Sequence, residues 1–304
     1  MTAKEILADI KSDRIKKVIL DCDAYNDIDD QYAIAFAAGS DRMELLAVGA
    51  VLFNNYRCSG FEDGMIKSYE ETVKELKLIG RDDSVRALRG CPVPMTELGE
   101  GVFGESEASD NIISTVLESD ETVYVIATGA ATNVASAIMK NPAIKENMCV
   151  VWVGCNDIRY DGEAGDFNVW QDADAGRYLL NCGVPLVLLP ALGPEGTGTQ
   201  MLRGTQETLD VIAGDSEAAR YFRCDLPELA YPGEIGWTHR FWDIAGVGVL
   251  HNPDAFDLEI ITAPRMRLDC TWAFEDGRHE IVYMNRLEPS AVFDDTFECI
   301  RRLV

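Results

Sequence analysis

Short apolar runs alternate with amphipathic segments along most of the chain, beginning with KKVILDC at residues 16–22. Such β-branched and apolar runs predict buried strands at 16–22, 44–53, 122–128, 148–154 and 184–190. Apolar residues at helical spacing predict helices over 28–40, 64–80, 132–140, 172–183 and 244–256. Strands that alternate with helices indicate a parallel sheet that is covered on both faces.

The C-terminal third of the chain has a different pattern. Residues 191–240 predict mainly helices and loops, whereas 258–274 and 279–285 predict two further strands in an antiparallel pair. No internal repeat, low-complexity tract or long linker interrupts the sequence. We therefore expect one domain over residues 1–304, with an α/β fold: a mostly parallel, Rossmann-like open central sheet flanked by helices.

Composition narrows the class of partner. The 304 residues are 47% hydrophobic and 26% charged, which is enough for a sizeable core. A net charge of −25 argues against nucleic acid or an anionic membrane and favours a small neutral substrate or a cation. The N-terminus has no apolar signal-peptide core and the nine cysteines form no C-x-x-C pair, so we expect a cytoplasmic protein with reduced thiols.

Five aspartates follow the first predicted strand within ten residues: Asp21, Asp23, Asp27, Asp29 and Asp30. Asp21 and Asp23 share one face of the strand end, and Asp29 and Asp30 begin the next helix, where the helix dipole favours carboxylates. Converging carboxylates repel one another unless a cation joins them, and oxygen ligands favour Ca²⁺ or Mg²⁺ over zinc. The alternative is one helix-capping aspartate among solvated loop charges.

Ligands of open parallel sheets bind beyond the carboxyl ends of the strands. The polar residues that follow each predicted strand should therefore converge with the aspartates on one site. They are Asn54 and Asn55, Thr128 and Gly129, and Gly154 and Asn156. No G-x-G-x-x-G follows the first strand, and no phosphate-binding G-x-x-x-x-G-K-[ST] loop or EF-hand loop occurs.

The segment DCDAYNDIDD (21–30) resembles the D-x-D-P-G-x-D-D signature of the nucleoside hydrolases, the inosine-uridine-preferring and purine-specific N-ribohydrolases, although it is two residues longer and lacks the Pro-Gly. Four further segments resemble the family in the same order, over about residues 16–260. They are ELLAVGAVLFNN (44–55), VIATGAATNVASAI (125–138), GDFNVWQDADAG (165–176) and FWDIAGVGVLHNPDAF (241–256).

The resemblance implies Ca²⁺-dependent hydrolysis of the N-glycosidic bond of ribonucleosides, by a dimer or tetramer. It implies Ca²⁺ ligands at Asp23, Asp30, Asp243 and the carbonyl of Thr128. Asp23 would also be the general base, and Asp21 would support the site. Ribose would contact Asp29, Asn54, Asp166 and Asn168.

The chain departs from the family pattern at the residue before Asp243. Trp242 stands where many members have a histidine that helps the base to leave, and it resembles the purine-specific branch, where a tryptophan stacks on the base. The alternative is a core tryptophan. His239 could reach the same pocket. A further departure is Asp166, which stands where the family has the glutamate of its E-F-N segment and is one methylene shorter. A second stacking partner stays open among Tyr25, Phe53, Tyr56 and Phe103.

Two other functions compete with this hypothesis. A Mg²⁺-dependent phosphatase of the haloacid-dehalogenase type also has D-x-D after its first strand, but it usually has Thr or Val where this chain has Tyr25, and it leaves GDFNVWQD unexplained. A protein that keeps the hydrolase fold but only binds a ribosyl ligand is the second alternative. Release of ribose with and without a chelator distinguishes the three.

Overall fold

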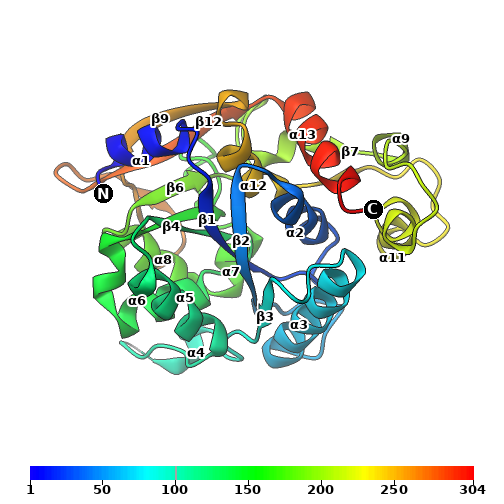
Figure 1. Ribbon diagram of the computed structural model, residues 1–304. Helices are drawn as coiled ribbons and strands as arrows, with labels where there is room; N and C mark the ends of the chain where they lie inside the picture. The colour runs from blue at the N-terminus through cyan, green and yellow to red at the C-terminus, as the bar shows by residue number, and fades with distance from the viewer. Residues whose placement is uncertain (100) are drawn as a thin grey trace.

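The computed structural model describes residues 1–99 and 101–304. An eight-stranded sheet runs through the centre of the molecule in the order β3-β2-β1-β4-β5-β6-β12-β9 (Figure 1). All neighbours pair in parallel except β12 and β9. The strands are β1 Lys16–Cys22, β2 Met43–Ala50, β3 Arg86–Leu88, β4 Val123–Ala127, β5 Met148–Val153, β6 Leu186–Leu189, β9 Phe256–Thr262 and β12 Glu280–Leu287.

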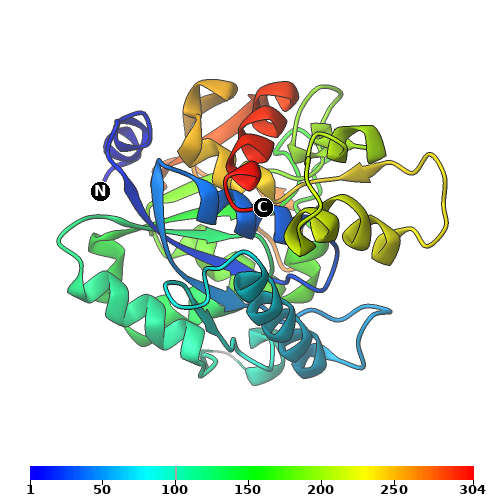
Figure 2. The same cartoon turned by 45° about the vertical axis from the view of Figure 1, so that its right-hand side comes forward.

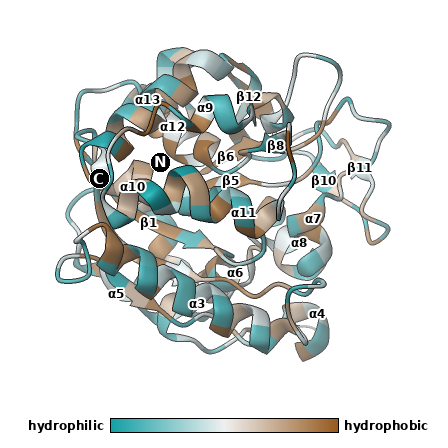
Figure 3. Ribbon diagram, turned by 90° about the vertical axis from the view of Figure 1, so that its right-hand side faces the viewer, coloured by the Kyte–Doolittle hydropathy of each residue, from teal (hydrophilic) through white to brown (hydrophobic). Residues whose placement is uncertain are grey.

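Helices cover both faces of this sheet, as the alternation of strands and helices predicted. Val18 and Leu20 of β1 pack in one core with α1 Ala3–Ile10, α2 Asp29–Gly39, α12 Ile244–His251 and α13 Pro289–Arg301. Ile19, between them, packs in a second core with α5 Glu107–Glu118, α6 Thr132–Lys140 and α8 Ala173–Asn181. Figure 3 shows apolar colouring on β5 and β6. A mostly parallel sheet with helices on both faces confirms the expected fold class.

The remaining elements are short, apart from α3 Phe61–Leu78, which packs beside β2 and β3. They are α4 Met95–Leu98, η1 Pro142–Glu146, α7 Phe167–Gln171, η2 Thr199–Met201, β7 Arg203–Gly204, α9 Gln206–Leu209, α10 Glu217–Arg220, the π-helical turn η3 Tyr221–Asp225, α11 Leu226–Ala230, β8 His239–Arg240, η4 Pro253–Ala255, β10 Arg265–Met266 and β11 Trp272–Ala273. In Figure 2 the yellow-green part of this series lies beside the C-terminus.

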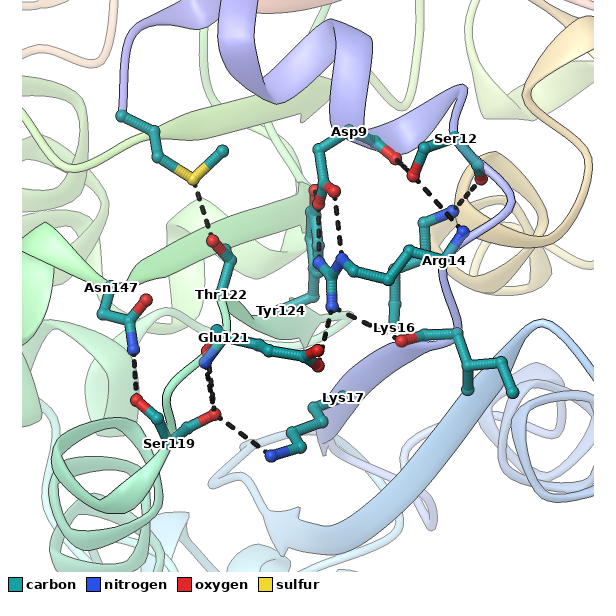
Figure 4. Close-up of polar contacts among 12 residues, drawn as sticks. Asp9, Ser12, Arg14, Lys16, Lys17, Ser119, Glu121, Thr122, Tyr124 and Asn147 are labelled. Carbon is teal, nitrogen blue, oxygen red and sulfur yellow. Dashed lines mark hydrogen bonds and ion pairs between the residues drawn. The ribbon is translucent and has the colours of Figure 1, made fainter.

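The start of the chain is fastened at the amino ends of the strands (Figure 4). The guanidinium of Arg14 donates two hydrogen bonds to Asp9 of α1, at 2.6 and 3.0 Å. The Tyr124 hydroxyl of β4 donates to the same carboxylate at 2.6 Å. Because this contact lies at the amino ends of the strands, α1 does not cover their carboxyl ends. Among the described residues, no helix is both long enough and apolar enough to cross a bilayer.

Candidate active site

The topology itself marks one place for a site. The chain runs outward from β1 through β2 to β3 and then returns to β4 on the other side of β1. A crevice opens at the carboxyl ends of the strands where the strand order reverses in this way. Asp21 and Asp23 lie at the end of β1 and Thr128 follows β4, with the Thr128 amide donating to the Asp21 carbonyl at 2.9 Å.

A cavity of about 410 Å³ opens at this point, which is a suitable size for a small organic ligand. Seven of the residues that the family resemblance implies for the site line it: Asp23, Asp29, Thr128, Asp166, Asn168, Trp242 and Asp243. The other lining residues are Asn26, Asp27, Asn55, Tyr56, Val153, Phe167, Ala191 and Leu192. Residues from seven separate stretches of the chain therefore meet here.

Four carboxylates are concentrated at one side of the cavity, of which Asp23, Asp29 and Asp243 line it and Asp30 does not. Asp23, Asp29 and Asp30 are each 1% exposed and Asp243 is 6% exposed. Burial raises the pKa of all four above the ordinary value, and the neighbouring carboxylates add to the rise for Asp23, Asp29 and Asp243. For Asp30 the raised pKa is about 6. Within residues 1–99 and 101–304, no Lys or Arg forms an ion pair with any of them.

Hydrogen bonds satisfy this cluster only in part. Asp30 Oδ1 accepts from the Thr128 hydroxyl at 2.7 Å, and Asp29 Oδ2 accepts from the Asp243 amide at 3.3 Å. Asp23 Oδ2 is buried and has no hydrogen-bond partner among the described residues. Buried oxygens without a protein cation form a donor set that fits a hard divalent ion. An additional grouping, in which ligand atoms of Asp27, Asp29 and His239 lie within 4.8 Å of one another, extends the acidic region.

Asp21 lies outside the cavity, although it is only two residues from Asp23. Its Oδ1 accepts from Asn133 Nδ2 of α6 at 2.9 Å, its Oδ2 has no partner in the described chain, and burial raises its pKa to about 7. Asn133 also donates to the Ala50 carbonyl at 3.2 Å. Asn133 therefore joins the ends of β1 and β2, a role that sequence reasoning missed although the residue lies in the quoted segment 125–138.

The short helix α7 supplies the two predicted polar contacts on another wall. The half-buried Asp166 caps this helix, because its Oδ1 accepts from the Val169 amide at 2.9 Å. Burial raises the pKa of Asp166 to about 6. Asn168 Nδ2 donates to the carbonyls of Thr128 at 2.8 Å and of Val153 at 2.9 Å, so it joins the ends of β4 and β5.

Asn54 is separated from the other predicted residues. Its side chain is exposed and does not line the cavity, and its backbone amide donates to Gln171 Oε1 at 2.7 Å. Asn55 lines the cavity in its place and donates to Asn26 Oδ1 at 2.7 Å. The strand-end rule pointed to Asn55 as well as Asn54, whereas the family resemblance selected Asn54. Asn26 and Asp27, which belong to the two-residue-longer loop, also line the cavity.

Aromatic side chains form a further part of the wall. Trp242 is partly buried, and Tyr56 and Phe167 are 88% and 41% exposed. Among the other stacking candidates, Phe53 is fully buried and neither Tyr25 nor Phe103 lines the cavity. Sequence reasoning missed Phe167, although its position between Asp166 and Asn168 could have indicated it.

His239 does not line this cavity. It is 5% exposed, its Nδ1 pairs with the Tyr231 hydroxyl at 2.9 Å, and its Nε2 is 3.5 Å from Asp27 Oδ1. Burial lowers its pKa, which favours the neutral imidazole. Neither His251 nor His279 lines the cavity, so no described histidine does.

Fold and site together define an open-sheet α/β protein with an acidic, partly aromatic ligand cavity at its topological switch point. The profile described as "Inosine-uridine preferring nucleoside hydrolase" matches residues 18–220 of the chain. The chain therefore belongs to the inosine-uridine preferring nucleoside hydrolase family.

Individual relatives are distant. The pyrimidine-specific ribonucleoside hydrolase RihB of Escherichia coli (strain SE11) is 26% identical over 212 residues, which is 65% of this chain and 64% of the relative. The chain thus spans less than two thirds of that relative's length. A purine-preferring ribonucleoside hydrolase from Gardnerella vaginalis superposes with a TM-score of 0.70 at 21% identity, covering 95% of this chain and 99% of that structure. An inosine-guanosine nucleoside hydrolase gives 0.72 at 18% identity, covering 94% and 98%.

Proposed function

We propose that this protein hydrolyses the N-glycosidic bond of ribonucleosides to ribose and a free base, with a Ca²⁺ ion as cofactor. The observation that carries the proposal is the cluster of buried carboxylates without a cationic partner beside an aromatic wall in one cavity. Membership of the nucleoside hydrolase family supports the same reaction.

The carboxylates would hold both the cofactor and the developing charge of the reaction. Asp23, Asp30, Asp243 and the carbonyl of Thr128 would hold the ion. What Ca²⁺ supplies when bound is positive charge that acidifies a water molecule and attracts ribose hydroxyl oxygens. Asp23, whose Oδ2 has no hydrogen-bond partner among the described residues, would accept the proton of the attacking water.

Breaking an N-glycosidic bond places positive charge on the sugar, as in an oxocarbenium ion. Asp29 and the other buried carboxylates stabilise that charge, because their orientation is set before the reaction begins. Asp166 and Asn168, on the neighbouring wall, would orient the ribose hydroxyls. The exposed Asn54 would need a loop movement to join them, whereas Asn55 already faces the cavity.

The base would stack against Trp242, with Tyr56 and Phe167 as further aromatic partners. No described histidine lines the cavity, so the leaving base would take its proton from solvent. A large aromatic wall favours the wider purine ring, and we therefore propose a purine preference. The name of the Escherichia coli relative indicates pyrimidines for that protein, so base preference is the part to measure first.

The experiment is ribose release from inosine, adenosine, guanosine, uridine and cytidine, with Ca²⁺ and with excess chelator. We expect chelator-sensitive release that is faster from purine nucleosides. Trp242→Leu should lower kcat/KM for inosine about tenfold, since one base–aromatic stack contributes about 1–3 kcal/mol. Equal rates for uridine and inosine would contradict the purine preference. No release from any nucleoside, with Ca²⁺ still bound, would favour a ribosyl-binding protein on the same fold.

The proposal extends to the organisation of the protein. We infer that residues 1–304 form one domain and that the protein is cytoplasmic. We also infer that it is a dimer or tetramer, as the resemblance implies. Light scattering by the purified protein measures the number of subunits.

A further inference from the structure

A second cavity, also about 410 Å³, adjoins the candidate active site. The two cavities share three lining residues, Asp27, Tyr56 and Trp242. Tyr56 and Trp242 are aromatic residues against which the base would stack, so Asp27 is the carboxylate of the wall that faces the base. Asp27 belongs to the loop that is two residues longer than the family pattern, and it has no role in the proposed function above.

The second cavity brings a histidine close to this carboxylate. His239 Nε2 lies 3.5 Å from Asp27 Oδ1, and it is buried without a hydrogen-bond partner among the described residues. Asp29 is another carboxylate nearby, since ligand atoms of the three residues lie within 4.8 Å of one another. The imidazole packs edge-on against Phe241, with ring centres 5.2 Å apart, so packing fixes its orientation.

The tyrosine behind the histidine determines which imidazole nitrogen carries the hydrogen. The Tyr231 hydroxyl is 2.9 Å from His239 Nδ1 and 3.3 Å from the Thr238 carbonyl oxygen, and the shorter contact takes the hydroxyl hydrogen. A neutral imidazole has one N–H, so Nδ1 accepts and Nε2 donates toward Asp27. The Tyr231 ring stacks on Trp237, with ring centres 5.4 Å apart, which holds the hydroxyl in place.

The surroundings of His239 favour the neutral imidazole. Burial lowers its pKa most strongly, the carboxylate of Asp27 raises it, and the charges of Arg57 and Arg240 lower it. His239 is therefore suited to donate a hydrogen bond to Asp27 rather than to be the proton source itself.

The two carboxyl oxygens of Asp27 have different surroundings. Oδ1 accepts from the Ile28 amide at 3.0 Å and faces His239 Nε2. Both of these groups are donors, so a proton on the carboxyl group belongs on Oδ2. The Asp27 side chain is 38% exposed, so water can supply that proton. A bound base would cover the carboxyl group and leave it beside Asp29, and both effects favour its protonated form.

We propose that Asp27 is the general acid that protonates the leaving base, and that His239 and Tyr231 are positioning residues for it. The inference rests on the proposed function, which places the base at the wall shared with Trp242. No described histidine lines the first cavity, so Asp27 is the route by which a proton from solvent reaches the base.

The protons and electrons of this step balance. When the bond between C1′ and the base nitrogen breaks, its electron pair stays on the base, and a ring nitrogen of the base takes the Oδ2 proton of Asp27. A charge-assisted hydrogen bond from His239 Nε2–H stabilises the carboxylate so formed, and the 3.5 Å separation shortens as that charge appears. Asp27 then takes a proton from water, while the attacking water loses one through Asp23.

The test compares inosine with 4-nitrophenyl β-D-ribofuranoside, whose leaving group departs as a stable anion and needs no proton. We expect Asp27→Asn to lower kcat for inosine about 10²-fold and to change kcat for the nitrophenyl riboside far less. Asp27→Glu keeps a carboxyl group and should recover part of the inosine activity. Asp225→Asn, the matched control, removes an exposed aspartate that lines neither cavity, and it should change neither rate.

Two substitutions of His239 test its part separately. His239→Phe removes the N–H group but keeps a ring against Phe241, and it should lower kcat for inosine about tenfold, as loss of a hydrogen bond to a charged group does. His239→Gln has an amide N–H and should lose less. Both should affect the nitrophenyl riboside far less than inosine. Equal losses on the two substrates would make His239 a structural residue only and overturn its positioning role.

The two substrates also separate this inference from the proposed function. An equal loss on both substrates in Asp27→Asn, or full activity of that variant on inosine, would overturn the role of Asp27 as the acid and leave nucleoside hydrolysis standing. Hydrolysis of the nitrophenyl riboside but of no nucleoside by the native protein would show a site without a leaving-group acid. Release of ribose from neither substrate would overturn the proposed function and this inference with it.

Discussion

Two aspartates separated by one residue have different surroundings in this protein. Each has one carboxylate oxygen without a partner among the described residues, but Asp23 lines the cavity, whereas Asp21 lies outside it and accepts a hydrogen bond from Asn133. A β-strand directs residues i and i+2 to the same face, so sequence alone could group the two but not distinguish them. What distinguishes them is Asn133, which comes from a helix more than a hundred residues later in the chain.

Asp23→Asn tests the role of the general base. We expect ribose release to fall by about 10²–10⁴-fold, because the amide cannot accept the proton of the attacking water. The fold should persist, since the change removes one of several buried like charges. Steady-state rates and a thermal melt check both parts. Asp254→Asn, which alters an exposed aspartate lining neither cavity, is the matched control. Near-normal turnover by Asp23→Asn would show that another group removes the proton.

At the scale of elements, long periodic segments were predictable and short or irregular ones were not. The predicted bounds of β1 and α6, at 16–22 and 132–140, agree with the structure. β3 was missed, because three residues with one buried position produce no readable pattern. The predicted strand over 258–274 is instead β9 followed by the small β10–β11 hairpin. β9 and β12 pair antiparallel as expected.

The candidate site could be predicted to a similar extent. The strand-end rule located Asp23, Asn55 and Thr128 because it depends only on topology. The side chains from loops, such as Tyr56 and Phe167, depend on the path of the backbone, which sequence pattern does not specify. Asn54 and Asn55 show the limit most clearly, since a difference of one residue decides which side chain faces the cavity.

The contact between α2 and α13 offers a test at this scale. A Cβ atom at Gly39, the last residue of α2, would lie 2.2 Å from the backbone carbonyl oxygen of Cys299 in α13. Alanine is the better helix former, but the clash is with backbone and cannot be relieved by a rotamer change. We expect Gly39→Ala to lower the free energy of unfolding by about 1–3 kcal/mol, measured with urea.

Gly248→Ala in α12 is the matched control. Its added Cβ would meet only side-chain atoms, at 3.2 Å and beyond, so a smaller loss is expected. If Gly39→Ala were as stable as the native protein, α2 and α13 would have to be able to move apart without loss of packing.

At the scale of the whole molecule, the buried carboxylates and the net charge of −25 both make the folded protein less stable as the pH rises. Burial raises the pKa of Asp21 to about 7 and those of Asp30 and Asp166 to about 6, each from an ordinary value of 3.8. A carboxyl group with a raised pKa in the folded state binds its proton more tightly there than in the unfolded chain. Its contribution to stability is complete below pH 3.8 and is lost as the pH rises to about 6–7.

We therefore expect the chelated protein to melt several degrees lower at pH 7.5 than at pH 5, because the ionised carboxylates then repel one another within the fold. Excess Ca²⁺ should raise Tm strongly at pH 7.5 and weakly at pH 5, since the ion binds ionised carboxylates and competes with protons. Asp243→Asn at matched ionic strength separates binding at the site from general screening of a highly negative protein. It should lose most of the Ca²⁺-induced rise in Tm. An equal rise in that variant would place the stabilising Ca²⁺ on the surface rather than in the cavity.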